Sequence, residues 1–548
     1  MKKNSIRNIL FFLLFINHPA QAQSVDNSYD VVIYGATSAG VIAAVAAKQN
    51  GASVMLLSPE KHVGGLTTSG LGWTDIGNQD RHKTIGGLTL DFFHRIRNHY
   101  QNAYTWKEEA FADYQEKAGN SIYKITDSMM WTFEPHAAEK VFNDLITENK
   151  IPLKTDQWLD RKHGVKKING NIVSITMLNG NTYRGKVFID ATYEGDLMAA
   201  AGVSYTTGRE ANSQYDETIN GIETALATKN NLPRGIDPYV QKGDPSSGLL
   251  PGIRRDAGGK DGEGDKKIQA YCYRVCLTDV PANRIMVAKP ANYQKRDFEL
   301  IVRAAQKGVQ TFWKLSPLPN RKTDSNNDGG VSTDYIGMDY SYPEASYALR
   351  RKMDEEHAYW TKGLIWTVQH DPGIPAEVRK KYASWGLHKD EFKDNGHMPY
   401  KLYVREARRM VSDFVMSENY LKGDKAVPES IAMGNYNMDS HNVQRYVTPD
   451  GDVQDEGDVE IGVKPPYGIS YRAIVPKRNE CSNLLVPVCL SASHVAYGSI
   501  RMEPVFMMLG QSSGIAAAFA VRQKKKVQDI SYAELQKKLV NSGMVLRF

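Results

Sequence analysis

The chain has 548 residues, of which 41% are hydrophobic and 24% are charged, and its formal net charge is +6. This is the composition of an ordinary globular protein with a sizeable core, which excludes global disorder. The excess of positive charge is small for this length and is not gathered into one block, apart from Lys524–Lys526. We therefore expect no nucleic-acid partner.

The first 22 residues have the pattern of a secretory signal peptide. Basic residues precede the apolar run ILFFLLFI, and Ala20-Gln21-Ala22 places small residues where a signal peptidase cleaves. The apolar run is too short to cross a bilayer, which takes about 20 residues, so we expect no membrane span. The sequence predicts a mature protein that is periplasmic or secreted.

Residues 30–58 predict one βαβ unit of the length that a dinucleotide fold requires. The strand Asp30–Tyr34 is followed by the turn GATSAG, the small-residue helix Val41–Gln49 and the strand Ser53–Leu57. Gly35 and Gly40 occupy the first and last glycine positions of the turn, Ala39 keeps the start of the helix slim, and Thr37 interrupts the strict glycine pattern. The amino end of the helix is expected to bind a pyrophosphate.

The residue that binds the adenosine ribose is expected at the end of the second strand. An acidic residue is usual there, but this chain has Ser58, and Glu60 two residues later is the alternative. A glycine-rich loop with Gly64 and Gly65 follows, and residues 80–150 are predicted to be mostly helical. Alternating runs around Asn179-Gly180 predict a hairpin over residues 170–190.

The segment FIDATYEGDLMAAAG, residues 188–202, predicts a strand that ends at Asp190, a turn and a second small-residue helix. Close approach of a ligand is expected at Ala191 and Thr192. Asp196 is expected to accept a hydrogen bond from a sugar-like hydroxyl, and capping of the helix is compatible with that role.

A helix beginning near Met507 contains Gly510, Gln511, Ser512, Ser513 and Gly514. Glycine inside a helix costs about 1 kcal/mol, which indicates close approach of a ligand or of another structural element. Packing of this helix on a second helix is therefore the alternative to a cofactor contact.

The four cysteines of the mature chain are Cys272, Cys276, Cys481 and Cys489. The first two lie in one predicted strand, about 13 Å apart, which is too far for a bond between them. Other pairings and free buried thiols both stay open. Without CxxC spacing or an adjacent histidine, we expect no metal site.

These motifs together resemble the FAD-dependent oxidoreductase family, whose bacterial members are often labelled xanthan lyase-like. The resemblance extends through AYCYRVCLTD, LPNRKTDSNNDGG, LYVREARRM and YNMDSHNVQRYV and covers essentially the whole mature chain. It implies an α/β fold of the glutathione-reductase type, with a Rossmann-type FAD-binding domain split by a large α+β substrate domain. It also implies FAD contacts at Gly35, Gly40, Gly64, Gly65, Thr192, Asp196 and the segment Gly510–Gly514.

The expected boundaries are a signal peptide over residues 1–22, FAD-binding segments over 27–204 and 466–548, and a substrate domain over 205–465. Flavin chemistry on a hydroxyl group needs a base for the substrate proton. His494 and His441 are the candidate bases, and Tyr497 is a candidate for holding the substrate or the flavin. Arg405 is an anion-binding candidate that would share a helical face with Arg409, four residues away.

The resulting hypothesis is an exported enzyme that oxidises a hydroxyl group of a sugar or sugar-derived small molecule, with FAD as the hydride acceptor. The identity of the final electron acceptor stays open. Two alternatives are a FAD-dependent C=C reductase, desaturase or lyase, and a carbohydrate-binding protein that keeps FAD structurally.

Overall fold

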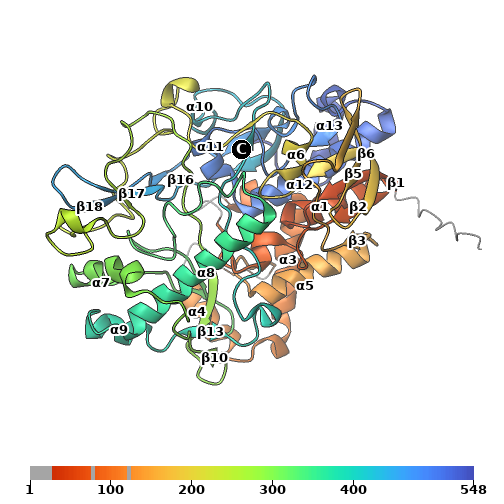
Figure 1. Cartoon of the computed structure of the whole chain (residues 1–548). Helices are drawn as coiled ribbons and strands as arrows, with labels where there is room; N and C mark the ends of the chain where they lie inside the picture. The colour runs from red at the N-terminus through yellow and green to blue at the C-terminus, as the bar shows by residue number, and fades with distance from the viewer. Residues whose placement is uncertain (1–27, 76–80, 120–124, 127) are drawn as a thin grey trace, which may run out of the picture.

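The computed structural model of the chain describes residues 28–75, 81–119, 125–126 and 128–548 (Figure 1). The predicted signal peptide lies outside these residues.

A sheet of seven strands positions the glycine turn, and its order is β3-β2-β1-β6-β5-β4, with β21 also beside β6. The strands β1, β2, β3, β6 and β21 are parallel to their neighbours along this core, whereas β4 and β5 are antiparallel. The apolar run at the end of β1 is buried throughout, as expected for a parallel strand covered on both faces. Their bounds are β1 Ser28–Tyr34, β2 Val54–Leu57, β3 Leu153–Lys154, β4 Val165–Ile168, β5 Asn171–Thr176, β6 Thr182–Asp190 and β21 Leu484–Leu485.

The strand β6 joins the amino-terminal and carboxy-terminal parts of the chain. Its first half pairs with β5, in the predicted hairpin, and its second half pairs with β21 through Phe188 and Leu484. The predicted end of this strand at Asp190 is confirmed. The carboxy-terminal segment therefore returns to the sheet that begins at residue 28, as the split arrangement requires.

Two helices pack on this sheet, α1 Ser38–Gln49 and α12 Glu503–Gln523, and two more pack against these helices, α3 Gly87–Gln101 and α5 Pro135–Glu148. The helix α12 is apolar and long enough to cross a membrane, but 94% of its apolar window is buried inside the molecule, where it packs on α1. Its start at Glu503 is four residues earlier than predicted, because Pro504 fits the first turn of a helix. The apolar character of α12 is thus explained by its place in the core.

A second region, in green in Figure 1, contains a five-stranded antiparallel sheet and three helices. The sheet order is β10-β13-β9-β12-β11. The bounds are β9 Val275–Thr278, β10 Arg284–Ile285, β11 Ser316–Leu318, β12 Lys322–Ser325, β13 Gly386–His388, α7 Glu299–Gln306, α8 Tyr347–His370 and α9 Ala376–Tyr382. This mixed α/β structure agrees with a Rossmann-type domain joined to an additional domain.

Smaller elements connect these parts. The helices are α2 Arg81–Thr84, α4 Phe111–Gly119, α6 Asp196–Ala200, α10 Glu418–Leu421, α11 His494–Ile500 and α13 Tyr532–Asn541. The strands are β7 Tyr205–Thr206, β8 Ile253–Arg254, β14 Arg409–Met410, β15 Ser430–Gly434, β16 Met438–Ser440, β17 Gln444–Val447, β18 Val453–Glu456, β19 Val459–Ile461 and β20 Tyr467–Ser470.

The structure also tests the helix expected around Arg405 and the state of the four cysteines. The prediction of a helix around Arg405 and Arg409 is wrong, because the chain there is extended and β14 pairs with β7. All four cysteines are buried free thiols.

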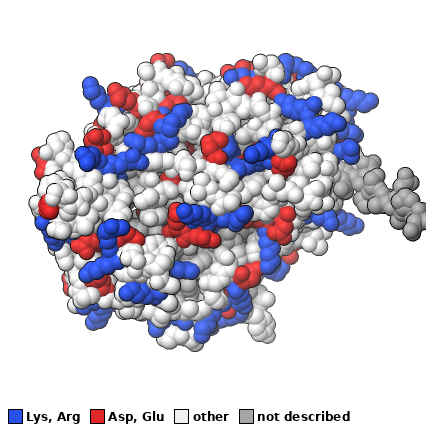
Figure 2. Space-filling view, in the orientation of Figure 1, with Lys and Arg blue, Asp and Glu red and all other residues white. Residues whose placement is uncertain are grey.

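On the face that Figure 2 shows, lysine and arginine lie interspersed with aspartate and glutamate.

Candidate functional site

The turn after β1 is shaped so that only glycine fits at its two ends. Gly35 has φ +104°, and a Cβ there would lie 2.8 Å from the backbone nitrogen of Thr192. A Cβ on Gly40 would lie 1.8 Å from the carbonyl oxygen of Gly35. The backbone of the turn is therefore bare of side chains at both places, as close approach of a pyrophosphate requires.

Thr37, which interrupts the glycine pattern, caps α1. Its Oγ1 accepts a hydrogen bond from the backbone N–H of Gly40 at 3.3 Å and donates to the carbonyl of Ala191 at 2.7 Å. The hydroxyl thus ties the amino end of α1 to the end of β6. The first turn of a helix leaves N–H groups without helical partners, and its positive end attracts phosphate.

A cleft opens beside this turn, and we call it the cofactor cleft. Four residues predicted from the sequence line it: Gly35, Ser58, Gly65 and Thr192. Ala39 and Gly40 lie just behind it in the first turn of α1, and Gly64 is bonded to the turn through the carbonyl of Ala36. The cleft is also lined by Thr37, Glu60, His62, Thr68, Glu194, Tyr400 and Lys401.

Lys401 closes one side of the cofactor cleft, and sequence reasoning missed it. Its Nζ lies 2.7 Å from Glu194 and 3.1 Å from Glu60. Burial opposes the charge, but these two carboxylates raise the pKa of Lys401 well above its ordinary value. No spacing in one sequence relates residue 401 to a turn at residue 35, so only the fold could reveal this contact. Ser58 and Glu60 both line the cleft, so both stay candidates for the ribose contact.

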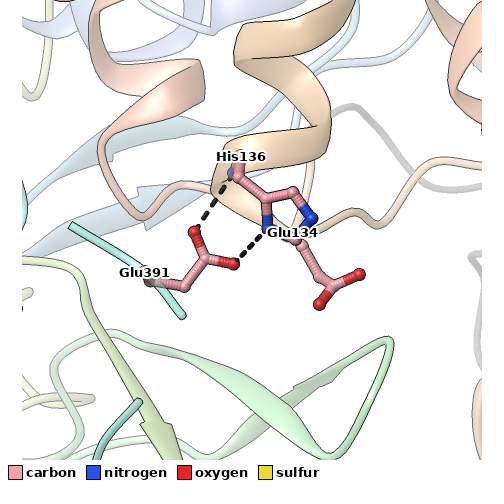
Figure 3. A group of neighbouring side chains, drawn as sticks. All are labelled: Glu134, His136 and Glu391. Atoms are coloured by element: carbon pink, nitrogen blue, oxygen red, sulfur yellow. Dashed lines mark hydrogen bonds and ion pairs between the residues drawn. The ribbon is translucent and has the colours of Figure 1, made fainter. Parts of the chain in front are cut away.

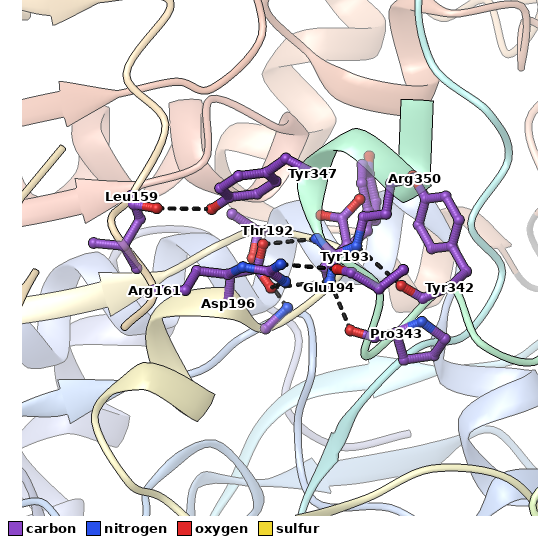
Figure 4. A network of polar contacts seen from close by, with 12 residues as sticks. Leu159, Arg161, Thr192, Tyr193, Glu194, Asp196, Tyr342, Pro343, Tyr347 and Arg350 are labelled. Carbon is purple, nitrogen blue, oxygen red and sulfur yellow. Dashed lines mark hydrogen bonds and ion pairs between the residues drawn. The ribbon is translucent and has the colours of Figure 1, made fainter. Parts of the chain in front are cut away.

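Asp196 has partners other than those predicted. Its carboxylate binds Arg350 at 2.7 Å and Arg161 at 3.1 Å (Figure 4). It also binds Arg408 at 2.8 Å. Although burial opposes ionisation, these guanidinium groups hold the pKa of Asp196 well below its ordinary value. Its oxygens are already occupied and it is not part of the cleft lining, so the structure gives it a structural role in place of a sugar-hydroxyl contact.

The small residues of α12 face protein, which corrects the expected cofactor contact. A Cβ on Gly510 would lie 2.3 Å from the carbonyl of Ala39, and one on Gly514 equally close to that of Ala43. Gln511 accepts a hydrogen bond from the backbone N–H of Leu88 at 2.8 Å, and Ser513 is fully buried. These four residues pack α12 against α1 and the start of α3.

Glu503, at the start of α12, reaches the turn with its side chain. Its carboxylate accepts hydrogen bonds from the hydroxyls of Ser38, Thr67 at 2.8 Å and Tyr193 at 2.7 Å. Burial raises the pKa of this carboxyl above its ordinary value. Glu503 thus joins the start of α12 to the cofactor turn.

The predicted anion-binding arginines are neutralised by carboxylates. Arg405 binds Asp334 at 2.9 Å, and Arg409 binds Glu210 at 2.7 Å. Both arginine side chains are fully buried. They hold the substrate region together and, with these partners, do not present a free positive charge to an anion.

The two candidate histidines have different surroundings. His494 is 2% exposed, and both ring nitrogens are engaged, by Glu406 at 2.7 Å and Ser440 at 3.0 Å. Burial and the nearby Arg409 and Arg209 lower the pKa of His494 to about 3. Tyr497 is also in the core, with its ring 6.3 Å from that of Phe506 and its pKa raised by burial.

His441 keeps one ring nitrogen available. Its Nδ1 lies 2.8 Å from Asp334, whereas its Nε2 is 3.7 Å from Asp439. In the neutral ring, with Nδ1 donating to Asp334, the lone pair is on Nε2. Of the two histidines, His441 is therefore the one that can accept a proton from a substrate.

One group of side chains has ligand atoms spaced closely enough to hold a metal ion among the residues with described positions: Glu134, His136 and Glu391 (Figure 3). The Nζ of Lys322 already lies 2.8 Å from Glu134 and 2.6 Å from Glu391. Its ammonium group occupies the place between the two carboxylates. This arrangement is an ion-pair cluster centred on a lysine.

A parallel sheet with a bare glycine turn at the amino end of its first helix, and a cleft beside that turn, defines a dinucleotide-binding α/β protein. The chain belongs to the FAD dependent oxidoreductase family, whose model matches residues 30–539. The family resemblance read from its motifs is thus confirmed, and membership of this family implies FAD as the cofactor. The turn fits a dinucleotide because side chains at Gly35 and Gly40 would collide with the backbone at the end of β6 and of the turn itself, so only glycine lets the first helix pack this closely on the sheet.

Solved structures resemble parts of the chain. They include the anhydrotetracycline hydroxylase OxyS from Streptomyces rimosus, with 14% identity and a TM-score of 0.21 over 34% of this chain and 36% of that one. A flavoprotein/dehydrogenase from Cytophaga hutchinsonii has 17% identity and a TM-score of 0.20, over 34% and 44%. The thioredoxin reductase of T. acidophilum has 19% identity and a TM-score of 0.17, over 34% and 40%.

The chain thus spans less than half the length of each of these three proteins. No curated protein sequence matches the chain.

Proposed function

We propose that the protein is an exported FAD-dependent oxidoreductase that oxidises a hydroxyl group of a sugar or sugar-derived substrate. Bound FAD supplies the hydride acceptor. The observation that carries this proposal is the state of His441, which combines a free Nε2 lone pair with a carboxylate partner on Nδ1. Oxidation of an alcohol requires removal of the hydroxyl proton, and this is the task for which such a histidine is suited.

The partners of His441 hold its ring in one tautomer. Asp334 accepts from Nδ1, and Asp334 is itself bound by Arg405 at 2.9 Å. The carboxylate stabilises the imidazolium that forms when Nε2 takes the substrate proton. Burial opposes the charge of Asp334, but Arg405 and His441 hold the pKa of Asp334 at about 2, so it stays ionised.

Polar contacts connect this histidine to the segment that leads into α12. Asp439, next to Nε2 of His441, binds Arg501 at 3.3 Å. Arg501 lies two residues before Glu503, whose carboxylate binds Ser38 in the first turn of α1. The ion pairs of the base thus reach the residue that directly precedes α12, and α12 begins with the glutamate that binds the turn, which supports His441 as the base of the flavin reaction.

The test uses the purified FAD-loaded protein without oxygen. Addition of an oxidisable sugar or sugar acid is expected to bleach the flavin absorbance at about 450 nm, because hydride transfer reduces the flavin. Bleaching by none of a panel of sugars and other alcohols would overturn the proposal. It would favour a C=C reductase, desaturase or lyase, or a protein in which FAD is structural.

The role of His441 is tested with the variant His441→Ala. We expect FAD to stay bound while flavin reduction by the sugar slows by about 10²–10⁴-fold, the usual contribution of a general base. The rate is expected to recover partly at high pH, where hydroxide can take the proton. His163→Ala, at an exposed histidine, is the matched control and should keep the full rate. An unchanged rate in His441→Ala would remove this histidine from the reaction.

Export is tested separately by the intact mass of protein recovered from the periplasm or the medium. The expected mass lacks residues 1–22. A mass that includes these residues would contradict cleavage by a signal peptidase.

A further inference from the structure

Two carboxylates flank the glycine turn at the edge of the parallel sheet. Glu60 follows β2 and Glu194 follows β6, and these two strands lie on either side of β1, which leads into the turn. The carboxyl ends of parallel strands meet at one edge of a sheet. Both side chains line the cofactor cleft, which therefore has two negative groups where an anionic pyrophosphate is expected to bind.

Lys401 lies between these two carboxylates. Its Nζ is 2.7 Å from Glu194 and 3.1 Å from Glu60. Among the described residues that line the cofactor cleft, it is the one lysine or arginine. The side chains of Lys401 and Glu60 are 14% and 38% exposed, so a ligand in the cleft can reach both of them. Lys401 thus supplies the positive charge that offsets the carboxylates of the cleft.

The segment that carries Lys401 is fixed on the loop after β2. The ring of Tyr400 stacks on that of His62, with ring centroids 3.5 Å apart and an interplanar angle of 7°. Asp394 lies 3.2 Å from Nε2 of the same histidine and also binds Lys61. Lys401 belongs to the chain between β13 and β14, so a region outside the parallel sheet provides the cation of the cofactor cleft.

The surroundings of Lys401 contain more acidic groups than basic ones. Asp354 of α8 also interacts with this lysine, and burial raises the pKa of Asp354 to about 7. Without Lys401, Glu60 and Glu194 would keep their negative charge beside the turn with no cation between them. Like charges brought together oppose binding, so the anionic pyrophosphate would be repelled from the turn.

We propose that Lys401 is a positioning residue for the cofactor, which neutralises Glu60 and Glu194 so that the pyrophosphate of FAD can bind at the turn between them. This role goes beyond the proposed function, because it concerns the binding of FAD and is the same for any substrate. It makes retention of the cofactor depend on the chain between β13 and β14, for which the sequence predicted substrate binding.

The dissociation constant of FAD tests this role. It is measured on the full-length FAD-loaded protein, by the fluorescence of flavin released on dilution and by titration with added FAD. We expect Lys401→Met, which removes the charge and keeps an unbranched side chain, to weaken FAD binding about tenfold or more. Lys401→Arg, which keeps the charge, should recover most of the affinity. The matched control is Lys186→Met, at an exposed lysine that pairs with Asp30 near the start of β1, and it should change the affinity less than twofold.

Variants of Glu194 separate neutralisation from a purely structural ion pair. Glu194→Gln breaks the same pair, so a structural role predicts weaker FAD binding, whereas neutralisation predicts equal or tighter binding. The double variant Lys401→Met/Glu194→Gln should bind FAD more tightly than Lys401→Met alone. Added salt should also reduce the defect of Lys401→Met, because ions screen the repulsion between the carboxylates and the pyrophosphate.

Three results would overturn the proposal. The first is FAD binding in Lys401→Met equal to that of the unchanged protein. The second is a defect that neither Glu194→Gln nor salt relieves, because Lys401 would then act by contacting FAD itself. The third is weaker FAD binding in Glu194→Gln alone, and this single variant decides the question if Lys401→Met does not fold. Circular dichroism of each variant establishes whether it folds.

Discussion

Gly510 of α12 lies directly against the backbone of Ala39 in α1, where an added Cβ would be 2.3 Å from the carbonyl oxygen. Ala39 belongs to the first turn of the helix that faces the cofactor cleft. The contact therefore fixes the position of the cofactor turn from the opposite end of the chain.

We expect Gly510→Ala to lower the stability of the protein by about 1–3 kcal/mol, the usual cost of an overpacked core contact. The two helix backbones must separate to admit the methyl group, and FAD affinity should fall as the turn shifts. Urea unfolding followed by circular dichroism measures the first effect, and flavin content after purification measures the second. Arg522→Ala, on an exposed position of the same helix, is the control. Equal stability of the two variants would contradict the packing role of Gly510.

Gly40→Ala is expected to abolish FAD binding. Its Cβ would lie 1.8 Å from the carbonyl oxygen of Gly35, so the turn must open and the helix must leave the strand. The purified variant should be colourless, whereas Lys525→Ala, at an exposed position, should be yellow and release FAD on denaturation. Full flavin occupancy in Gly40→Ala would refute the assignment of this turn.

Asp196→Asn separates a structural role from a cofactor contact. Loss of one partner from a buried ion-pair cluster costs about 3–5 kcal/mol, and here three arginines lose their shared carboxylate. We expect a lower thermal midpoint but unchanged FAD content per folded molecule. Asp424→Asn, at an exposed aspartate, controls for the change in charge. If the midpoint stays and FAD is lost, Asp196 contacts the cofactor after all.

Because His494 is buried and neutral in the folded protein, we expect the protein to lose stability in mild acid. Burial lowers its folded pKa to about 3 from the ordinary value of 6.5, so between these two pH values the unfolded chain binds a proton that the folded protein does not. Stability from this group is complete above pH 6.5 and falls as the pH decreases, by about 2 kcal/mol at pH 5.

The measurement is the difference between the unfolding free energies of the unchanged protein and His494→Gln, taken from pH 7 to pH 5. Glutamine does not titrate, so the difference should shrink by about 2 kcal/mol over this range. His163→Gln should leave the pH dependence as it is. A constant difference for His494→Gln would mean that His494 takes up its proton at the same pH in the folded and unfolded states.

Much of the fold could be predicted because its elements depend on local sequence patterns. The run Asp30–Tyr34, the turn Gly35–Gly40 and the hairpin around Asn179-Gly180 each depend on neighbouring residues, and each has the predicted form. The helix expected around Arg405 failed because periodic charge spacing also occurs in extended chain. That segment is held by long-range ion pairs, such as the one from Arg405 to Asp334.

The site was predicted less completely than the fold. Ser58, Gly65 and Thr192 line the cofactor cleft as expected, since each follows a strand or a glycine of a recognisable motif. Lys401 and Glu503 were missed, because their role depends on side chains more than 200 positions away in the sequence.

The sequence by itself determined that a dinucleotide turn follows the first strand, because φ angles and close backbone approach restrict residue choice locally. Only the tertiary structure decided which polar groups are free to act. His441 and His494 are both histidines in polar segments, yet burial and the two contacts of His494 leave it neutral and enclosed, whereas His441 keeps its Nε2. Protonation and access depend on groups brought together by folding, and these are not encoded in the spacing of neighbouring residues.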